Sequence, residues 1–92
     1  MAKKIIVYGS TECPPCVAIK KRLDDEGIHY GYVDVLAGLA HFKKFIVLRD
    51  SNYSLYEDAV KSGSIGIPTL VVDDKDIYID AQVTALDINV LK

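Results

Sequence analysis

The sequence has no cluster of basic residues and no long apolar run, and both absences exclude classes of protein. Its net charge is −2 and its lysines are scattered, so nothing favours binding to a nucleic acid or to an anionic membrane. No segment is long and apolar enough to cross a membrane. The apolar run after Lys4 is too short for a signal peptide, so we expect a cytoplasmic protein in a reducing compartment.

Cysteine and proline are both scarce, and their positions are informative. Both cysteines and two of the three prolines form the motif Cys-Pro-Pro-Cys at Cys13–Cys16, shortly after the apolar run Ile5–Tyr8. Two cysteines at this spacing can close a small ring when oxidised. When reduced, the first can lie at a helix start, where a thiolate is favoured. The motif therefore predicts thiol–disulfide exchange. The third proline, Pro68, precedes another apolar run, Leu70–Val72.

The length and composition predict a single domain over residues 1–92. Half of the residues are apolar, and a chain of this size buries enough surface for a core of its own. No repeat, linker or bias towards disorder is present.

The first third of the chain has the pattern of a strand–helix–strand unit. Residues 5–8 are apolar and β-branched, as in a buried strand, and residues 30–35 predict a second strand. A helix between them is expected to begin at Cys13 and to end near Gly27, with Cys16, Ile19 and Leu23 on its buried face. A unit of this kind pairs its two strands in parallel.

The rest of the chain predicts two further helices, a hairpin and a short last helix. Apolar residues between Leu39 and Ile46 indicate an amphipathic helix, and residues 54–57 have the spacing of a capping box that begins another. Residues 69–73 and 77–79 flank a turn-rich segment and predict a hairpin. Residues 84–87 are expected to cap the last helix.

A Cys-x-x-Cys motif in a βαβ unit, followed by a hairpin entered through Ile67 and Pro68, resembles the thioredoxin superfamily. Residues 8–16, Tyr-Gly-Ser-Thr-Glu-Cys-Pro-Pro-Cys, resemble glutaredoxins, and residues 39–68 are similar to a bacterial group of small glutaredoxin-related proteins. The resemblance implies an α/β protein of thioredoxin-like (glutaredoxin) fold, with a four-stranded mixed sheet flanked by helices. It also implies a cis bond between Ile67 and Pro68, with Pro68 against the cysteine pair.

Two features depart from the glutaredoxin pattern. Glutaredoxins usually carry Gly-Gly and then Asp after the hairpin, where one end of glutathione is held, but residues 76–82 contain no glycine. They also commonly place a basic residue three positions before the first cysteine. Here that residue is Ser10, and the acidic Glu12 adjoins Cys13. Both departures disfavour glutathione as a substrate.

The expected catalytic residues are the two cysteines. Cys13 is the nucleophile, and Cys16 resolves the mixed disulfide that forms on Cys13. Pro68 is expected to form a rigid wall, and the backbone of Ile67 to pair with an extended substrate segment, as in the superfamily. The candidate substrate-binding residues are Tyr8, Pro14, Pro15, Ile67 and Pro68. Tyr8 has a second interpretation, as a strand residue that only packs.

Two other uses of the cysteine pair stay open. Two chains could share a metal ion or an iron–sulfur cluster, since His29 and His41 do not complete a common structural zinc site within one chain. The pair could also form a purely structural disulfide. We predict a monomeric thiol–disulfide oxidoreductase without bound cofactor or metal, acting on protein or small-molecule disulfides, with glutathione or a flavoprotein reductase as electron donor.

Overall fold

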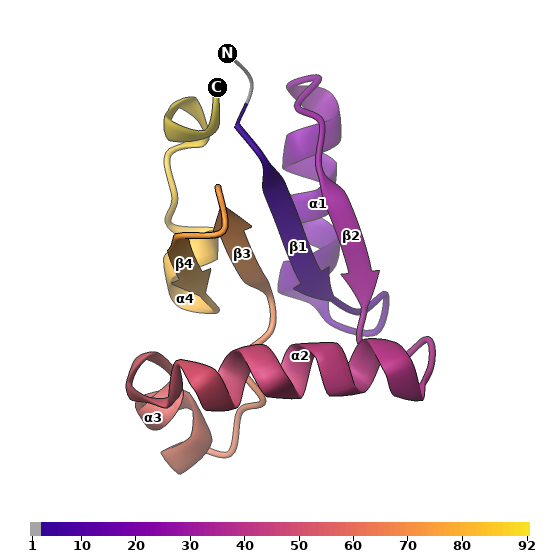
Figure 1. Cartoon of the computed structure of the whole chain (residues 1–92). Coiled ribbons are helices and arrows are strands. Elements are labelled where there is room, and N and C mark those ends of the chain that lie inside the picture. Colours follow the sequence, from indigo (N-terminus) through magenta and orange to yellow (C-terminus); the bar gives the residue numbers. More distant parts are fainter. Residues whose placement is uncertain (1–2) are drawn as a thin grey trace.

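Four strands form one mixed sheet in the computed structural model, which describes residues 3–92. They are β1 (Ile5–Gly9), β2 (Gly31–Asp34), β3 (Thr69–Val72) and β4 (Asp76–Ile79), in the order β2-β1-β3-β4 (Figure 1). β1 is parallel to β2 and antiparallel to β3, and β4 is antiparallel to β3. The expected mixed sheet, the parallel pair and the hairpin are confirmed.

Helix α1 (Pro14–Asp25) connects β1 to β2 and begins where the sequence predicted. Cys13 is its N-cap, and prolines occupy the first two positions, where a missing N–H costs no hydrogen bond within the helix. Cys16, Ile19 and Leu23 are buried, which confirms the predicted face. Gly27, with φ of 67°, follows the helix in the left-handed conformation that glycine adopts readily.

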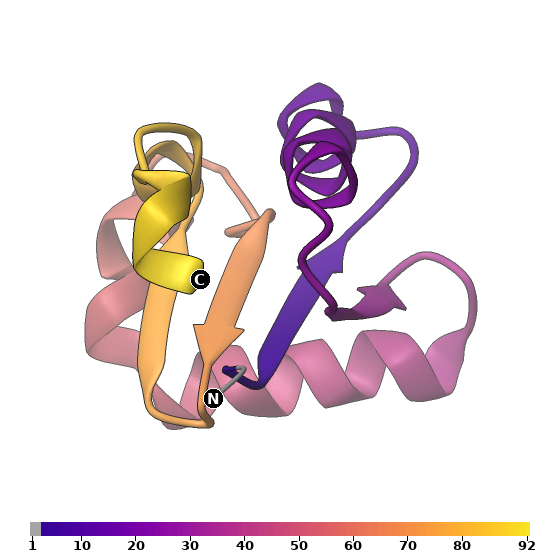
Figure 2. The same ribbon diagram turned by 90° about the horizontal axis from the view of Figure 1, so that it is seen from above.

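Helices cover both faces of the sheet. Figure 2 shows α1 and α2 (Leu39–Ser51) on opposite sides of it. α1 packs on the first face with the short helices α4 (Ala81–Thr84) and η1 (Ile88–Leu91), whereas α2 and α3 (Tyr53–Lys61) pack on the second. Because side chains alternate along β1, Val7 lies in the first core and Tyr8 in the second.

The predicted amphipathic stripe on α2 is only partly buried. Phe45 is fully buried, but Leu39 and Phe42 are 67% and 41% exposed. The N-terminal end of α2 extends past the edge strand β2 (Figure 1).

The expected capping box at residues 54–57 is wrong. α3 already begins at Tyr53, so Ser54 lies inside the helix, and the N-cap Asn52 makes no side-chain cap hydrogen bond. Asn52 is also the C-cap of α2, where its Nδ2 donates to the Leu48 carbonyl at 2.9 Å. The side chain is therefore used by the preceding helix.

The cap expected within residues 84–87 is only partly right. Thr84 ends α4 instead of starting a helix. Asp87 does cap η1, and its Oδ1 accepts from the Asn89 N–H at 3.0 Å.

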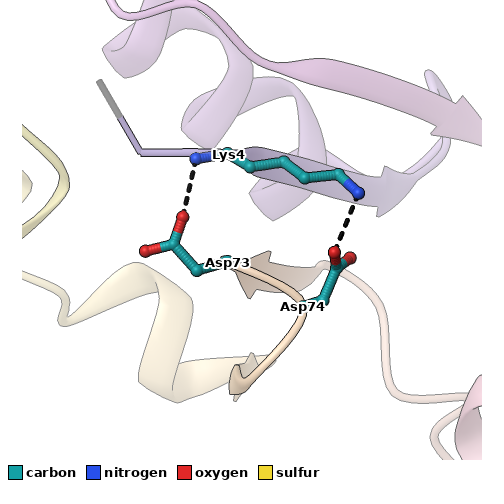
Figure 3. Close-up of polar contacts among 3 residues, drawn as sticks. All are labelled: Lys4, Asp73 and Asp74. Carbon is teal, nitrogen blue, oxygen red and sulfur yellow. Dashed lines mark hydrogen bonds and ion pairs between the residues drawn. The ribbon is translucent and has the colours of Figure 1, made fainter. Parts of the chain in front are cut away.

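The β3–β4 turn is fixed to the start of β1 by Lys4. The Lys4 N–H donates to Asp73 Oδ1 and its Nζ pairs with Asp74 Oδ2, both at 2.9 Å (Figure 3). Asp73 and Asp74 have φ of 55° and 57°, and the Lys75 N–H donates to the Val72 carbonyl, as in a type I′ hairpin turn. These contacts hold the end of the sheet that lies away from the cysteine motif.

Within residues 3–92, no helix has both the length and the apolar character needed to cross a membrane.

Candidate active site

A tight turn carries the chain from β1 into α1 and places Cys13 at the helix start. The Ser10 carbonyl accepts from the Cys13 N–H at 3.2 Å, and Ser10 Oγ accepts from the Glu12 N–H at 3.1 Å. The Cys13 carbonyl then accepts from the Val17 N–H at 3.1 Å, which begins the helix. The turn thus presents the Cys13 side chain at the positive end of the α1 dipole.

The two cysteines are free thiols in different surroundings. Cys13 is partly exposed and makes no side-chain cap hydrogen bond, in keeping with Pro15 at the second helical position, which has no N–H to give. Cys16 is 0% exposed. Burial, together with the adjacent Cys13, raises the pKa of the Cys16 thiol to about 12. Cys16 is therefore protonated and shielded at neutral pH.

Gly9 allows the sheet to approach Cys16 closely. A Cβ atom at Gly9 would lie 2.9 Å from Cys16 Cβ and 3.0 Å from its Sγ, distances too short for a real contact. The same Cβ would lie 3.1 Å from the hydroxyl oxygen of Tyr32. Cys16 and the Tyr32 hydroxyl therefore both lie on the side of Gly9 where a side chain would project.

Tyr32 is a residue of the site that the sequence did not reveal. It reads as a packing residue on a strand, and only the β1–β2 register, Val7 opposite Tyr32, places its hydroxyl near the cysteines. Burial, with smaller contributions from Cys16 and Asp34, raises the pKa of Tyr32 to about 12. Lys20 Nζ lies 5.0 Å from the centre of the Tyr32 ring, within the range of a cation–π contact.

Pro68 lies at the same end of the sheet as the cysteine turn. Thr69 pairs with Tyr8, and the same antiparallel register continued by one residue places Pro68 beside Gly9. The Ile67–Pro68 bond is cis, as the resemblance implied. Pro68 is buried and Ile67 is partly exposed, so the backbone before the proline forms an edge beside the cysteine motif. We refer to residues 67–68 as the proline edge.

Buried hydroxyl groups hold the loop that leads to the proline edge. The Thr69 hydroxyl donates its one proton to the Gly66 carbonyl at 2.8 Å. Thr69 Oγ1 therefore accepts a hydrogen bond from the Tyr56 hydroxyl, whose oxygen lies 2.8 Å from it. The Tyr56 ring packs edge-on against Phe45, with 6.2 Å between ring centroids. Residue 66 is thereby fixed against the second core.

The structure does not bring Tyr8 together with the cysteines. Its side chain is 6% exposed, and its ring packs against Phe45 with 6.0 Å between centroids, in the core on the face opposite Cys16. Burial also raises the pKa of its hydroxyl. This placement favours the packing interpretation of Tyr8. Pro14 and Pro15 are exposed in the first turn of α1, directly after Cys13.

Asp80 is a second residue of this region that the sequence did not reveal. It follows β4, and its N–H donates to the Pro68 carbonyl at 2.8 Å, which ties it to the proline edge. Its φ of 52° and ψ of −114° are unusual for a residue with a side chain. In the sequence this segment stands out only for its missing glycines, because the contact between Asp80 and Pro68 depends on strand register. In the part of the chain described, no three His, Cys, Asp or Glu side chains are grouped as a metal site.

A mixed sheet with a two-cysteine helix start beside a cis proline defines the thioredoxin-like class of proteins. A model of the glutaredoxin family matches residues 5–77, which is most of the chain. The chain therefore belongs to the glutaredoxin family, as the resemblance indicated, and the family supports thiol–disulfide oxidoreductase chemistry.

A relative from Haemophilus influenzae (strain ATCC 51907 / DSM 11121 / KW20 / Rd) is similar along most of its length. It is 34% identical over 80 residues, which cover 87% of this chain and 91% of the relative. It is described as an uncharacterized protein, so this similarity supports the family and specifies no substrate.

The contrast between the two thiols predicts selective alkylation. In the reduced, folded protein we expect iodoacetamide to modify Cys13 and to spare Cys16 between about pH 7 and 9, because alkylation requires a thiolate. With its pKa raised to about 12, Cys16 is ionised to roughly one part in a thousand at about pH 9. Fragment-ion mass spectrometry identifies the labelled residue. In urea both cysteines should react at similar rates, and labelling mainly at Cys16 in the folded protein would reverse the two roles.

Proposed function

We propose that this protein reduces disulfides by a dithiol mechanism. The Cys13 thiolate attacks one sulfur of the substrate disulfide, forms a mixed disulfide and releases the other sulfur as a thiolate. Cys16 then gives up its proton and attacks Cys13 Sγ, which forms the Cys13–Cys16 disulfide. The second substrate sulfur leaves as a thiolate, and the two released thiolates take up protons. An external electron donor then supplies two electrons, and with two protons from solvent the Cys13–Cys16 disulfide returns to two thiols.

One observation carries this proposal: an accessible Cys13 at the helix start, with a shielded Cys16 one turn further on. A nucleophile must be exposed to reach a protein disulfide. A resolving thiol must stay protonated until the mixed disulfide is in place, because an ionised Cys16 would compete for the substrate. The raised pKa of Cys16 and its burial agree with the second requirement.

The electron donor that we propose is a flavoprotein reductase, with glutathione a poor substitute. Glutathione has a net negative charge at neutral pH, and Glu12 and Asp80 both lie close to the site. In addition, residues 76–82 supply side chains where glutaredoxins have an open glycine backbone. These features act against the tripeptide and leave the dithiol route intact.

A turnover assay tests the mechanism and the donor together. Insulin serves as the protein disulfide, and NADPH consumption is followed with either thioredoxin reductase or glutathione plus glutathione reductase. We expect the protein to reduce insulin when thioredoxin reductase is the electron donor. When glutathione and glutathione reductase are the donor, insulin reduction should be much slower. Failure to reduce insulin even with dithiothreitol as donor would contradict the oxidoreductase proposal. Faster turnover with glutathione would instead identify a glutathione-dependent glutaredoxin.

A further inference from the structure

A hollow of about 470 Å³ lies between α3 and the junction of β4 with α4. α3 contributes Leu55, Asp58 and Ser62 to its lining, and the junction contributes Ile79, Asp80 and Gln82. We call it the acid-lined hollow, because its two ionisable side chains, Asp58 and Asp80, are carboxylates. None of its lining residues is basic.

The acid-lined hollow adjoins the active site through Asp80. The Asp80 N–H donates to the Pro68 carbonyl, so the hollow begins where the proline edge ends. The Asp80 carboxylate is also near enough for its charge to contribute to the raised pKa of Cys16. A substrate segment that extends along the backbone of Ile67, with its cysteine bonded to Cys13, would therefore pass the mouth of the hollow.

The two carboxylates of the hollow have no cationic partner within residues 3–92. The ion pairs there use other acidic residues: Asp25, Glu26, Asp50, Glu57 and Asp74. Lys61, the lysine of α3, is bound to Glu57 at 2.9 Å. Asp58 and Asp80 therefore leave the hollow with an uncompensated negative charge beside the site where substrates react.

The lining also has an apolar part. Leu55 is 53% exposed at the hollow, and Ile79 forms part of the opposite wall. Lysine and arginine side chains combine an aliphatic stem with a cationic end, and so match a wall of this composition. Aspartate or glutamate would be repelled by it.

We propose that the acid-lined hollow binds a lysine or arginine side chain of the disulfide substrate. It thereby selects protein substrates with a basic residue a short distance from the reacting cysteine. The inference rests on the proposed disulfide reduction and adds the chemical class of its substrate.

A set of peptide disulfides that differ in one residue tests the inference. Each peptide carries lysine, alanine or glutamate at one position, placed two or three residues before or after its cysteine, and the rate constant for its reduction by the reduced protein is measured by stopped flow. At low salt, in at least one placement, we expect lysine to react roughly three- to fivefold faster than alanine, and glutamate slower by a similar factor, as for exposed ion pairs. At about 1 M salt, where charges are screened beyond about 3 Å, the preference should largely disappear.

Matched variants locate the effect. Asp58→Asn and Asp80→Asn should each reduce the preference for lysine, and asparagine also tolerates the positive φ of residue 80. Asp76→Asn changes the net charge by the same amount at the other end of β4, outside the hollow, and should keep the preference. The alanine peptide should react with Asp76→Asn at the native rate.

Three results would overturn the inference: equal rates for all peptides, a lysine preference that survives in the Asp58→Asn/Asp80→Asn double variant, or an equal loss in Asp76→Asn. Its failure differs from that of the proposed function. If the peptides are all reduced at one rate, only the hollow has been misassigned. If none is reduced, the oxidoreductase proposal itself fails.

Discussion

Cys16→Ser is expected to slow turnover with protein disulfides by about a hundredfold or more and to leave substrate covalently attached to Cys13. In the native protein the resolving thiol lies one helical turn from Cys13, and an attack within one molecule reaches effective concentrations that millimolar external thiols do not match. Without it, the mixed disulfide persists until a free thiol arrives. Turnover is measured with the flavoprotein donor, and the trapped adduct by intact-protein mass spectrometry without reductant.

Cys13→Ser is the matched control for this experiment. It retains Cys16, but that thiol is buried and protonated, so we expect neither turnover nor an adduct. Near-native activity of Cys16→Ser with glutathione would contradict the dithiol mechanism, because it would mean that glutathione resolves the adduct.

Gly66→Ala is expected to lower the free energy of unfolding by about 3 kcal/mol. Residue 66 has φ of 95°, which costs an alanine about 1 kcal/mol, and a Cβ there would lie 2.6 Å from Cδ1 of the buried Tyr56 ring. Overpacking of this kind costs about 2 kcal/mol more. Because Tyr56 holds Thr69, the proline edge should also shift, and the rate of disulfide reduction should fall. Urea unfolding gives the stability.

Gly63→Ala separates the two contributions. Its φ is 84°, yet a Cβ at residue 63 would meet no atom within 4 Å. It should therefore lose only the backbone contribution, about 1 kcal/mol, and keep native activity. Equal losses for the two variants would show that contact with Tyr56 has no energetic weight.

The sequence was sufficient wherever the determining signal is local. The apolar run of β1, the cysteine at a helix start and the three buried positions of α1 are set by residues within one or two turns of each other. The hairpin was also predicted, although its turn lies at Asp73 and Asp74 and not at residues 74–76 as expected. The position of Pro68 beside the motif came from the resemblance to a family and not from a local pattern.

The parts that sequence reasoning missed depend on register and on competition between neighbouring elements. Tyr32 and Asp80 reach the site through strand pairing, which no short window of sequence specifies. Residues 54–57 have the spacing of a capping box, but α3 starts earlier because Asn52 already joins it to α2. Leu39 and Phe42 fit a helical stripe, yet both stay exposed, because burial depends on which parts of the fold pack against that helix.

The burial of Cys16 makes this residue a built-in reporter of motion in the folded chain. Its sulfur lies against Gly9, so a reagent can reach it only when α1 separates from the sheet or the whole domain unfolds. In the absence of substrate, the slow residual rate at which Cys16 is labelled therefore measures how often that separation occurs. The ratio of this rate to the labelling rate of Cys16 in the unfolded protein gives a free energy of opening. The same thiol that is proposed to release the substrate from Cys13 thus records, between cycles, how firmly the helix is seated.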